Sequence, residues 1–271
     1  MVERVKHGDD VDGCACLECR GVRSIATRRG IGDVLLWSVG FLRDRPSIPL
    51  VFLALGVVQF AGYVGPLGLE LATSGLVFFA APLARGYAVT IVSGELTGHR
   101  YTPRRAAGHA LRRTPAVIAT MVFVGVATMG LVFVGTILGI VVVLSDSALL
   151  TGAGIVALLV LFVLLIVVLV KFILAAEAVV VGGYGPIAAL RVSWGLVSFR
   201  RRTTIVLVSM VVAIATAFAM TEISATLEPY PIVGAEMTAT VVFGGSTALT
   251  YLSSAVSAAV FCHLYVQGVL E

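Results

Sequence analysis

The sequence predicts an all-α integral membrane protein with six transmembrane helices and three amphipathic interfacial helices on the cytoplasmic side. The chain of 271 residues is 59% hydrophobic and 13% charged, with a mean hydropathy of +1.04. Soluble domains carry roughly a quarter charged residues, so most of this surface is expected to face lipid. The apolar residues also lack the alternation of barrel strands, which favours helices whose backbones are satisfied internally.

Six apolar runs are long enough to cross a bilayer, because a helix needs about 20 apolar residues to span about 30 Å of hydrocarbon. They cover residues 46–64, 68–93, 115–144, 153–181, 203–225 and 236–266. The third and fourth runs exceed this length and are expected to tilt or to extend past the bilayer. We therefore divide the chain into a tail, residues 1–29, and a membrane domain, residues 30–271.

Positive charges predict the orientation of these spans. All 19 Lys and Arg residues lie before the first run, between Arg85 and Arg113, at Lys171, or between Arg191 and Arg202. The three remaining connections carry only acidic charges. Cytoplasmic connections are enriched in Lys and Arg, so both termini are predicted to be cytoplasmic in a multi-pass protein of the cell (plasma) membrane. The polar first 30 residues do not resemble a cleavable signal peptide.

Three basic segments precede the odd-numbered runs and predict a repeat. They are residues 41–46 (FLRDRP), 110–115 (ALRRTP) and 198–203 (SFRRRT). Each ends a short candidate surface helix, so the predicted unit is one surface helix followed by two spans, used three times. The second helix has the clearest start signals, with Thr102 as its cap and Pro103 at its first position.

Arginines of these segments are the candidate residues for contact with lipid headgroups. They are Arg43, Arg45, Arg112, Arg113, Arg200, Arg201 and Arg202. Each Lys or Arg near an anionic membrane surface contributes roughly 1 kcal/mol of attraction. Membrane lipids, chiefly anionic ones, are therefore the predicted partners, and nucleic acid is not. The same bias orients most membrane proteins, and the sequence leaves open a protein partner or a homo-oligomer.

The stretch from Ala176 to Trp194, AEAVVVGGYGPIAALRVSW, carries a resemblance to a known group. A span that ends near a glutamate is followed by G-P-I-x-A-L-x-x-S-W, a basic patch and another span. This resembles the membrane domain associated with glycerophosphoryl diester phosphodiesterases and its stand-alone prokaryotic and archaeal relatives of unknown function. The resemblance extends over roughly residues 30–266 in architecture and implies a helical membrane domain. No soluble stretch here is long enough for the catalytic barrel, so phosphodiesterase activity is not expected.

The tail contains a compact cysteine cluster, Cys14, Cys16 and Cys19, with His7 upstream. Three thiolates and one imidazole could complete a tetrahedral zinc site, and a cytoplasmic location keeps thiols reduced. Structural zinc sites, however, usually combine two separated ligand pairs, and the neighbouring acidic residues are typical of a disordered tail. Zinc at this cluster is the single cofactor that the sequence suggests, and a tail without metal is the alternative.

Charges within or near the apolar runs are candidates for function. Arg85 lies late in the second run and Glu177 late in the fourth, and both approach the cytoplasmic boundary from the same side. We expect them to pair, with Glu95 and Lys171 as competing partners. The pair could line a polar cavity that opens to the cytoplasm, or it could simply lock two helices together while Arg85 extends toward water.

Small and hydroxyl residues predict close helix packing in two runs. Ser246, Thr250, Ser254 and Ala258 recur every four residues in the sixth run, and the third run contains Gly135-x-x-x-Gly139. Such patterns permit close approach of helices and interhelical hydrogen bonds, although hydroxyls could also line a hydrated path. Cys262 and His263 belong to no motif and are interpreted as core or interfacial residues.

No catalytic constellation is present in the sequence: there is no H-E-x-x-H, no G-x-S-x-G and no phosphate-binding glycine loop. The sequence therefore predicts a membrane protein that is not an enzyme and that organises lipid or a membrane partner. The alternative is a transporter or exporter of a small or amphipathic solute, which internal repetition favours. Against transport, the runs show no interruption with polar groups at mid-membrane depth.

Overall fold

A computed structural model describes residues 30–98, 100–145, 147–197 and 235–270, and the secondary structure of these residues is helical throughout. The helices follow one another along the chain as α2 (Ile31–Asp44), α3 (Ser47–Tyr63), α4 (Leu67–Leu96), α5 (Pro103–Val143), α6 (Ala148–Lys171), α7 (Ala175–Glu177), the π-helix η2 (Ala178–Gly182), α8 (Pro186–Leu196) and α10 (Ala235–Leu270).

Four of these segments are long and apolar enough to cross a membrane: α4, α5, the stretch Ala148–Gly182 that contains α6, α7 and η2, and Phe243–Val269 within α10. A fifth results if α2 and α3, which are bent by 85° relative to each other, count as one broken span. The prediction of a helical membrane protein is confirmed to this extent. Run 203–225, the cysteine tail with Cys14, Cys16 and Cys19, and Arg200, Arg201 and Arg202 lie outside the described residues.

The structure contains two of the three predicted surface helices as separate elements. α2 and α8 are separate short helices that precede apolar segments, as the repeat requires. The second one is not separate, because α5 continues from Pro103 to Val143 with Pro115 inside it. Thr114 sits one residue before this proline, and its hydroxyl donates to Ala110 O over 2.9 Å. One proline without a glycine or a capping signal bends a helix more readily than it ends one. The threefold repeat stays a prediction.

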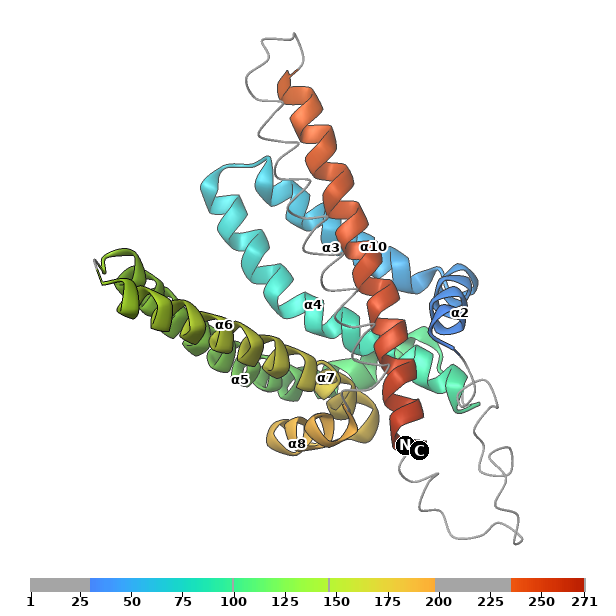
Figure 1. Ribbon diagram of the computed structural model, residues 1–271. Helices are drawn as coiled ribbons and strands as arrows, with labels where there is room; N and C mark the ends of the chain where they lie inside the picture. The colour runs from blue at the N-terminus through green and yellow to red at the C-terminus, as the bar shows by residue number, and fades with distance from the viewer. Residues whose placement is uncertain (1–29, 99, 146, 198–234, 271) are drawn as a thin grey trace, which may run out of the picture.

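Helices α3, α4 and α10 pack together, and α2 lies beside α10 (Figure 1). Small residues lie where α4 and α10 pack: Ala88, Ala255 and Ala259 are fully buried. Larger side chains such as Val92 and Leu96 fill the space between them. Small residues bring helix backbones close, so dispersion contacts can hold helices together inside lipid.

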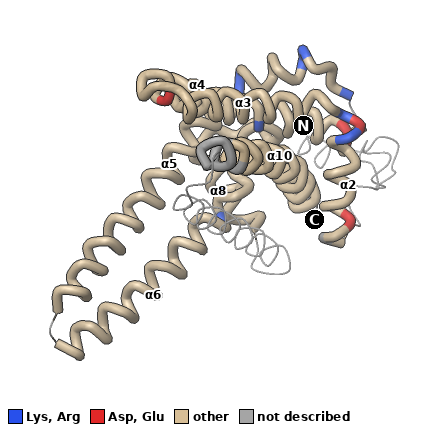
Figure 2. The backbone as a smooth tube through the Cα atoms, turned by 90° about the horizontal axis from the view of Figure 1, so that it is seen from above, with Lys and Arg blue, Asp and Glu red and all other residues tan. Residues whose placement is uncertain are grey.

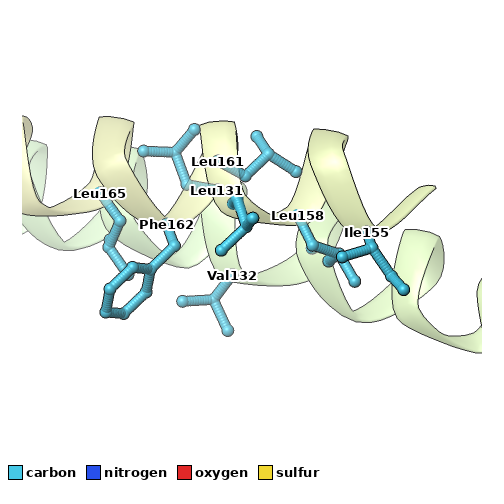
Figure 3. A pocket seen from close by; sticks show the side chains of 9 residues that line it. Leu131, Val132, Ile155, Leu158, Leu161, Phe162 and Leu165 are labelled. Atoms are coloured by element: carbon cyan, nitrogen blue, oxygen red, sulfur yellow. The ribbon is translucent and has the colours of Figure 1, made fainter. Parts of the chain in front are cut away.

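Helices α5 and α6 form a hairpin that projects away from this core, as two perpendicular views show (Figures 1 and 2). None of the most apolar stretch of α5 is buried and 11% of that of α6, against 50% for α4 and 56% for α10. Between the two helices runs a groove of about 410 Å³, lined by nine residues, among them Leu131, Ile155 and Phe162 (Figure 3). Every lining residue is apolar or glycine, which suits contact with acyl chains.

Candidate functional site

The candidate site lies where the α6 span is interrupted. α6 ends at Lys171, a short turn leads into α7, and η2 follows directly after Glu177. The π-helix ends at Gly182, and the next residue, Gly183, has a φ of 75°, in the left-handed region that glycine adopts without steric cost. Gly185 and Pro186 then begin α8. π-Helical turns occur frequently at functional sites, which makes the residues around this interruption candidates for function.

Arg85 and Glu177 form an ion pair at this interruption. Arg85 Nη2 and Nε donate to the same oxygen, Glu177 Oε1, over 2.6 and 3.1 Å. Glu177 is fully enclosed, whereas 26% of the Arg85 side chain is exposed. The ring of Phe261 lies 5.6 Å from the guanidinium carbon. The second carboxylate oxygen, Oε2, has no hydrogen-bond partner among the described residues.

Two side chains of α5 hold the segment that follows Glu177. His109 Nε2 donates to Val180 O over 3.0 Å, and Arg113 Nη1 donates to Gly183 O over 3.1 Å. Both carbonyls belong to the stretch where the regular α-helical bonding pattern is lost, so they are available to side-chain donors. Three basic side chains, from α4 and α5, therefore contact residues 177–183.

The two competing partners make other contacts. Glu95 pairs with Arg45 at 3.4 Å and approaches Arg100 at 4.0 Å. Lys171 Nζ donates to Trp194 O and Val197 O over 3.1 and 2.6 Å at the end of α8. Lys171 thus caps the carbonyl end of α8, where a positive charge is favourable. The structure brings Arg85 together with Glu177 rather than with either alternative.

The hydroxyl ridge of α10 bonds within its own helix. Ser246, Thr250 and Ser254 donate to carbonyls of the preceding turn at 2.8 to 2.9 Å. Thr250 and Ser254 are exposed, and Ala258 is buried. The expected interhelical hydrogen bonds are therefore not formed by these three hydroxyls within the described part of the chain.

The glycine pair of α5 and the Cys262–His263 pair of α10 differ in environment. A Cβ added at Gly135 or Gly139 would meet nothing within 4 Å, so neither glycine mediates close packing between described helices.

Cys262 is enclosed and its thiol lies 3.5 Å from Val89 O, while the His263 ring lies edge-on to Trp37 at 5.3 Å. These positions agree with the interpretation of Cys262 and His263 as core residues.

Sequence reasoning missed the π-helix and the contacts of His109 and Arg113 with carbonyls. A signal was present in Gly182-Gly183-Tyr184-Gly185-Pro186, because two glycines before a proline interrupt a helix. Among the residues that the structure describes, no three His, Cys, Asp or Glu side chains are placed to hold a metal ion. The arrangement offers instead one enclosed carboxylate and three basic groups.

Comparison with known proteins yields one match. No curated protein and no solved structure matches the chain. The resemblance to the phosphodiesterase-associated membrane domain stays a prediction. A family model described as a domain of unknown function, DUF7847, matches residues 31–268. The chain belongs to this family.

Proposed function

We propose that this is a non-enzymatic integral membrane protein that organises anionic lipid at one membrane surface. The observation that supports this proposal most strongly is the separation of charge from apolar surface. Within the described helices no Lys or Arg lies in α3, in α5 after Arg113, in α6 before Lys171, or in α10. In the described residues of the α5–α6 hairpin, no charged side chain lies between Arg113 and Lys171 (Figure 2).

Exposed arginines gather where the helices emerge from the apolar zone. Arg104, Arg105 and Arg112 lie in the first turns of α5 and are exposed, directly before its apolar stretch. Arg43 on α2 and Arg191 on α8 are also exposed. Within the described residues none of these side chains forms an ion pair, unlike Arg85 and Arg45, so they suit phosphate oxygens of lipid headgroups.

Orientation follows from the same charges. We propose that the arginine-rich end faces the cytoplasm of a plasma membrane and that both termini lie on that side. Alkaline phosphatase fused after Glu271 is expected to be inactive, whereas the same reporter placed in the α3–α4 turn is expected to be active. The opposite pattern would reverse the orientation.

Transport is the second candidate, and the interrupted span with enclosed Glu177 favours it, because transporter sites are often built at broken helices. The groove described above does not support it, since it lies between α5 and α6 and is lined by apolar side chains. Arg85 and Glu177 also lie late in their spans, close to the arginine-rich end. Lipid organisation therefore accounts for more of the described surface.

Lipid binding in nanodiscs tests the proposal. The protein is reconstituted in mixed anionic and zwitterionic lipid, and the lipid retained after detergent extraction is identified by native mass spectrometry. Changing Arg104, Arg105 and Arg112 together to Gln is expected to lower anionic-lipid retention about a hundredfold, since each contributes roughly 1 kcal/mol.

Glu70→Gln is the matched control, because Glu70 is exposed in the first turn of α4, far along the helix from Arg85. This change is expected to leave retention unaltered. Equal retention in the triple variant would contradict lipid organisation. A water-soluble solute that stays bound to the triple variant but not to Glu177→Gln would support transport instead.

A further inference from the structure

The surroundings of residues 177–183 contain more basic than acidic groups. Arg85, His109 and Arg113 all contact this stretch, and Glu177 is the acidic side chain to which any of them binds within the described residues. A neutral His109 leaves one excess positive charge, and a protonated one leaves two. A partly buried site with such an imbalance favours a further anion.

One amino group of the Arg85 guanidinium, Nη1, is available to donate hydrogen bonds. Its Nε and Nη2 both bind Glu177 Oε1, so Nη1 has no hydrogen bond within the described part of the chain. A fork-to-fork pair would instead engage both carboxylate oxygens. A quarter of the Arg85 side chain is exposed, so an incoming group reaches the guanidinium without first opening the core.

Glu177 is held by this single partner. Both of its carboxylate oxygens are enclosed, and Oε2 has no partner among the described residues. If Arg85 turned to another anion, Glu177 would be an uncompensated charge in an apolar interior. A buried carboxylate in that position takes up a proton rather than remain charged.

We propose that Arg85 binds an anionic oxygen group, a phosphate or a carboxylate, in exchange for Glu177, and that Glu177 takes up one proton in the same step. One anion and one proton enter together, and no covalent bond changes. The site uses none of the exposed arginines of α5, so it is a property beyond lipid organisation and can fail independently of it.

Other titratable groups lie on every element that packs against α7. These are Arg85 on α4, His109 and Arg113 on α5, Arg191 on α8, and Cys262, His263 and Tyr265 on α10, with Lys171 just before α7. The Cys262 thiol is within electrostatic reach of Glu177. His109 is the group whose own protonation would also strengthen anion binding, so a test must separate it from Glu177.

The test uses full-length protein in zwitterionic nanodiscs and radiolabelled sulfate, whose charge does not change across the pH range. Wild-type affinity is expected to rise about tenfold for each unit that pH falls while Glu177 is ionised, because one proton enters with each anion. Glu177→Gln is expected to bind sulfate at least tenfold more tightly than wild type at neutral pH, and, when combined with His109→Gln, to show no pH dependence.

Three further variants separate the alternatives. Arg85→Gln is expected to lose sulfate binding, while His109→Gln keeps the wild-type pH slope and exposed Arg112→Gln changes neither affinity nor slope. Melting temperature and gel filtration report folding, and the conservative Glu177→Gln variant carries the test if Arg85→Gln does not fold. A pH-independent wild type, or Glu177→Gln no tighter than wild type, would overturn the exchange and leave a structural ion pair.

The source of the anion is decided by adding phosphatidylglycerol, whose phosphodiester also keeps a constant charge. Loss of sulfate binding as this lipid is added, dependent on Arg85, identifies a lipid headgroup as the natural occupant. Sulfate binding that persists identifies a free anion from solution. Absence of Arg85-dependent binding of either probe would contradict the proposal.

Discussion

The α4–α10 core and the α5–α6 hairpin have opposite environments, and the more exposed hairpin is also the more apolar of the two. Half or more of the most apolar stretch is buried in α4 and α10, and almost none of it in the hairpin. The higher hydropathy of the hairpin suits contact with lipid, but burial of apolar surface does not draw helices together in a bilayer, because lipid tails are as apolar as the side chains. Small residues explain it better: Ala88, Ala255 and Ala259 are enclosed in the core, whereas Leu159 and Phe162 project from the hairpin.

Charge follows the same division. The core holds the enclosed Glu177 and its partner Arg85, while the hairpin beyond Arg113 holds no charged side chain in its described residues. An enclosed ion pair costs desolvation and is retained where it specifies an arrangement or a function. The core is therefore the specific part of the fold, and the hairpin is its lipid-facing part.

The largest expected effect breaks the ion pair. Arg85→Leu leaves Glu177 without its counter-charge, so the free energy of unfolding is expected to fall by about 3–5 kcal/mol. Unfolding in mixed detergent micelles measures it. The double change Arg85→Leu and Glu177→Leu is expected to be more stable than Arg85→Leu alone. If the single and double variants were equally stable, the pair would not couple α4 to α7.

Removing a large side chain sharpens the contrast between the regions. Leu96→Ala in the core leaves a cavity and is expected to cost about 2–5 kcal/mol, because Leu96 is fully enclosed. Leu159→Ala, the matched change in the hairpin, exchanges protein–lipid contact for lipid alone and is expected to cost less than about 0.5 kcal/mol. Equal losses of unfolding free energy would show that the hairpin is packed as tightly as the core.

Glycine substitutions test the same contrast at the backbone. A Cβ at Gly182 would lie 2.5 Å from the Tyr265 hydroxyl and from the Tyr184 ring, so Gly182→Ala is expected to cost about 1–3 kcal/mol. Gly139→Ala meets nothing within 4 Å and is expected to gain about 0.5–1 kcal/mol from helix propensity. Thermal unfolding compares both with wild type. A destabilised Gly139→Ala would mean that another helix packs on that face.

The smallest expected effect concerns the end of α8. Lys171→Met removes two hydrogen bonds to the carbonyls of Trp194 and Val197 and is expected to cost about 1–2 kcal/mol. Amide hydrogen exchange is expected to rise in α8 and to stay unchanged in α10. Protection lost equally in both helices would contradict a local role for Lys171.

The sequence predicted the apolar helices well, since run length and composition decide whether a helix can cross a bilayer. It also predicted the contact of Arg85 with Glu177, because two opposite charges at the same depth of neighbouring spans favour each other. It could not predict which apolar faces are buried. That depends on contacts between helices distant in sequence, and Gly135 and Gly139 carry a packing pattern without meeting a partner in the described structure.

The sequence also failed to predict where helices continue and where they break. Pro115 was expected to separate a surface helix from a span, yet α5 continues through it. Residues 153–181 were expected to form one run, yet the helix breaks after Lys171 and the run ends in a π-helix. Side-chain hydrogen bonds accompany both features: Thr114 donates back to Ala110 O before Pro115, and His109 donates to the Val180 carbonyl in η2.

Spin-label accessibility tests most directly the claim that a protein-packed core carries a lipid-facing hairpin. Nitroxides at Val132 and Leu159 in the hairpin and at Val260 in the core are compared in nanodiscs for collision with oxygen. The hairpin labels are expected to be mobile and readily reached by oxygen, and the Val260 label immobile and protected, since Val260 is 8% exposed. Immobile, oxygen-protected labels at Val132 and Leu159 would show that another helix covers the hairpin and would contradict this account.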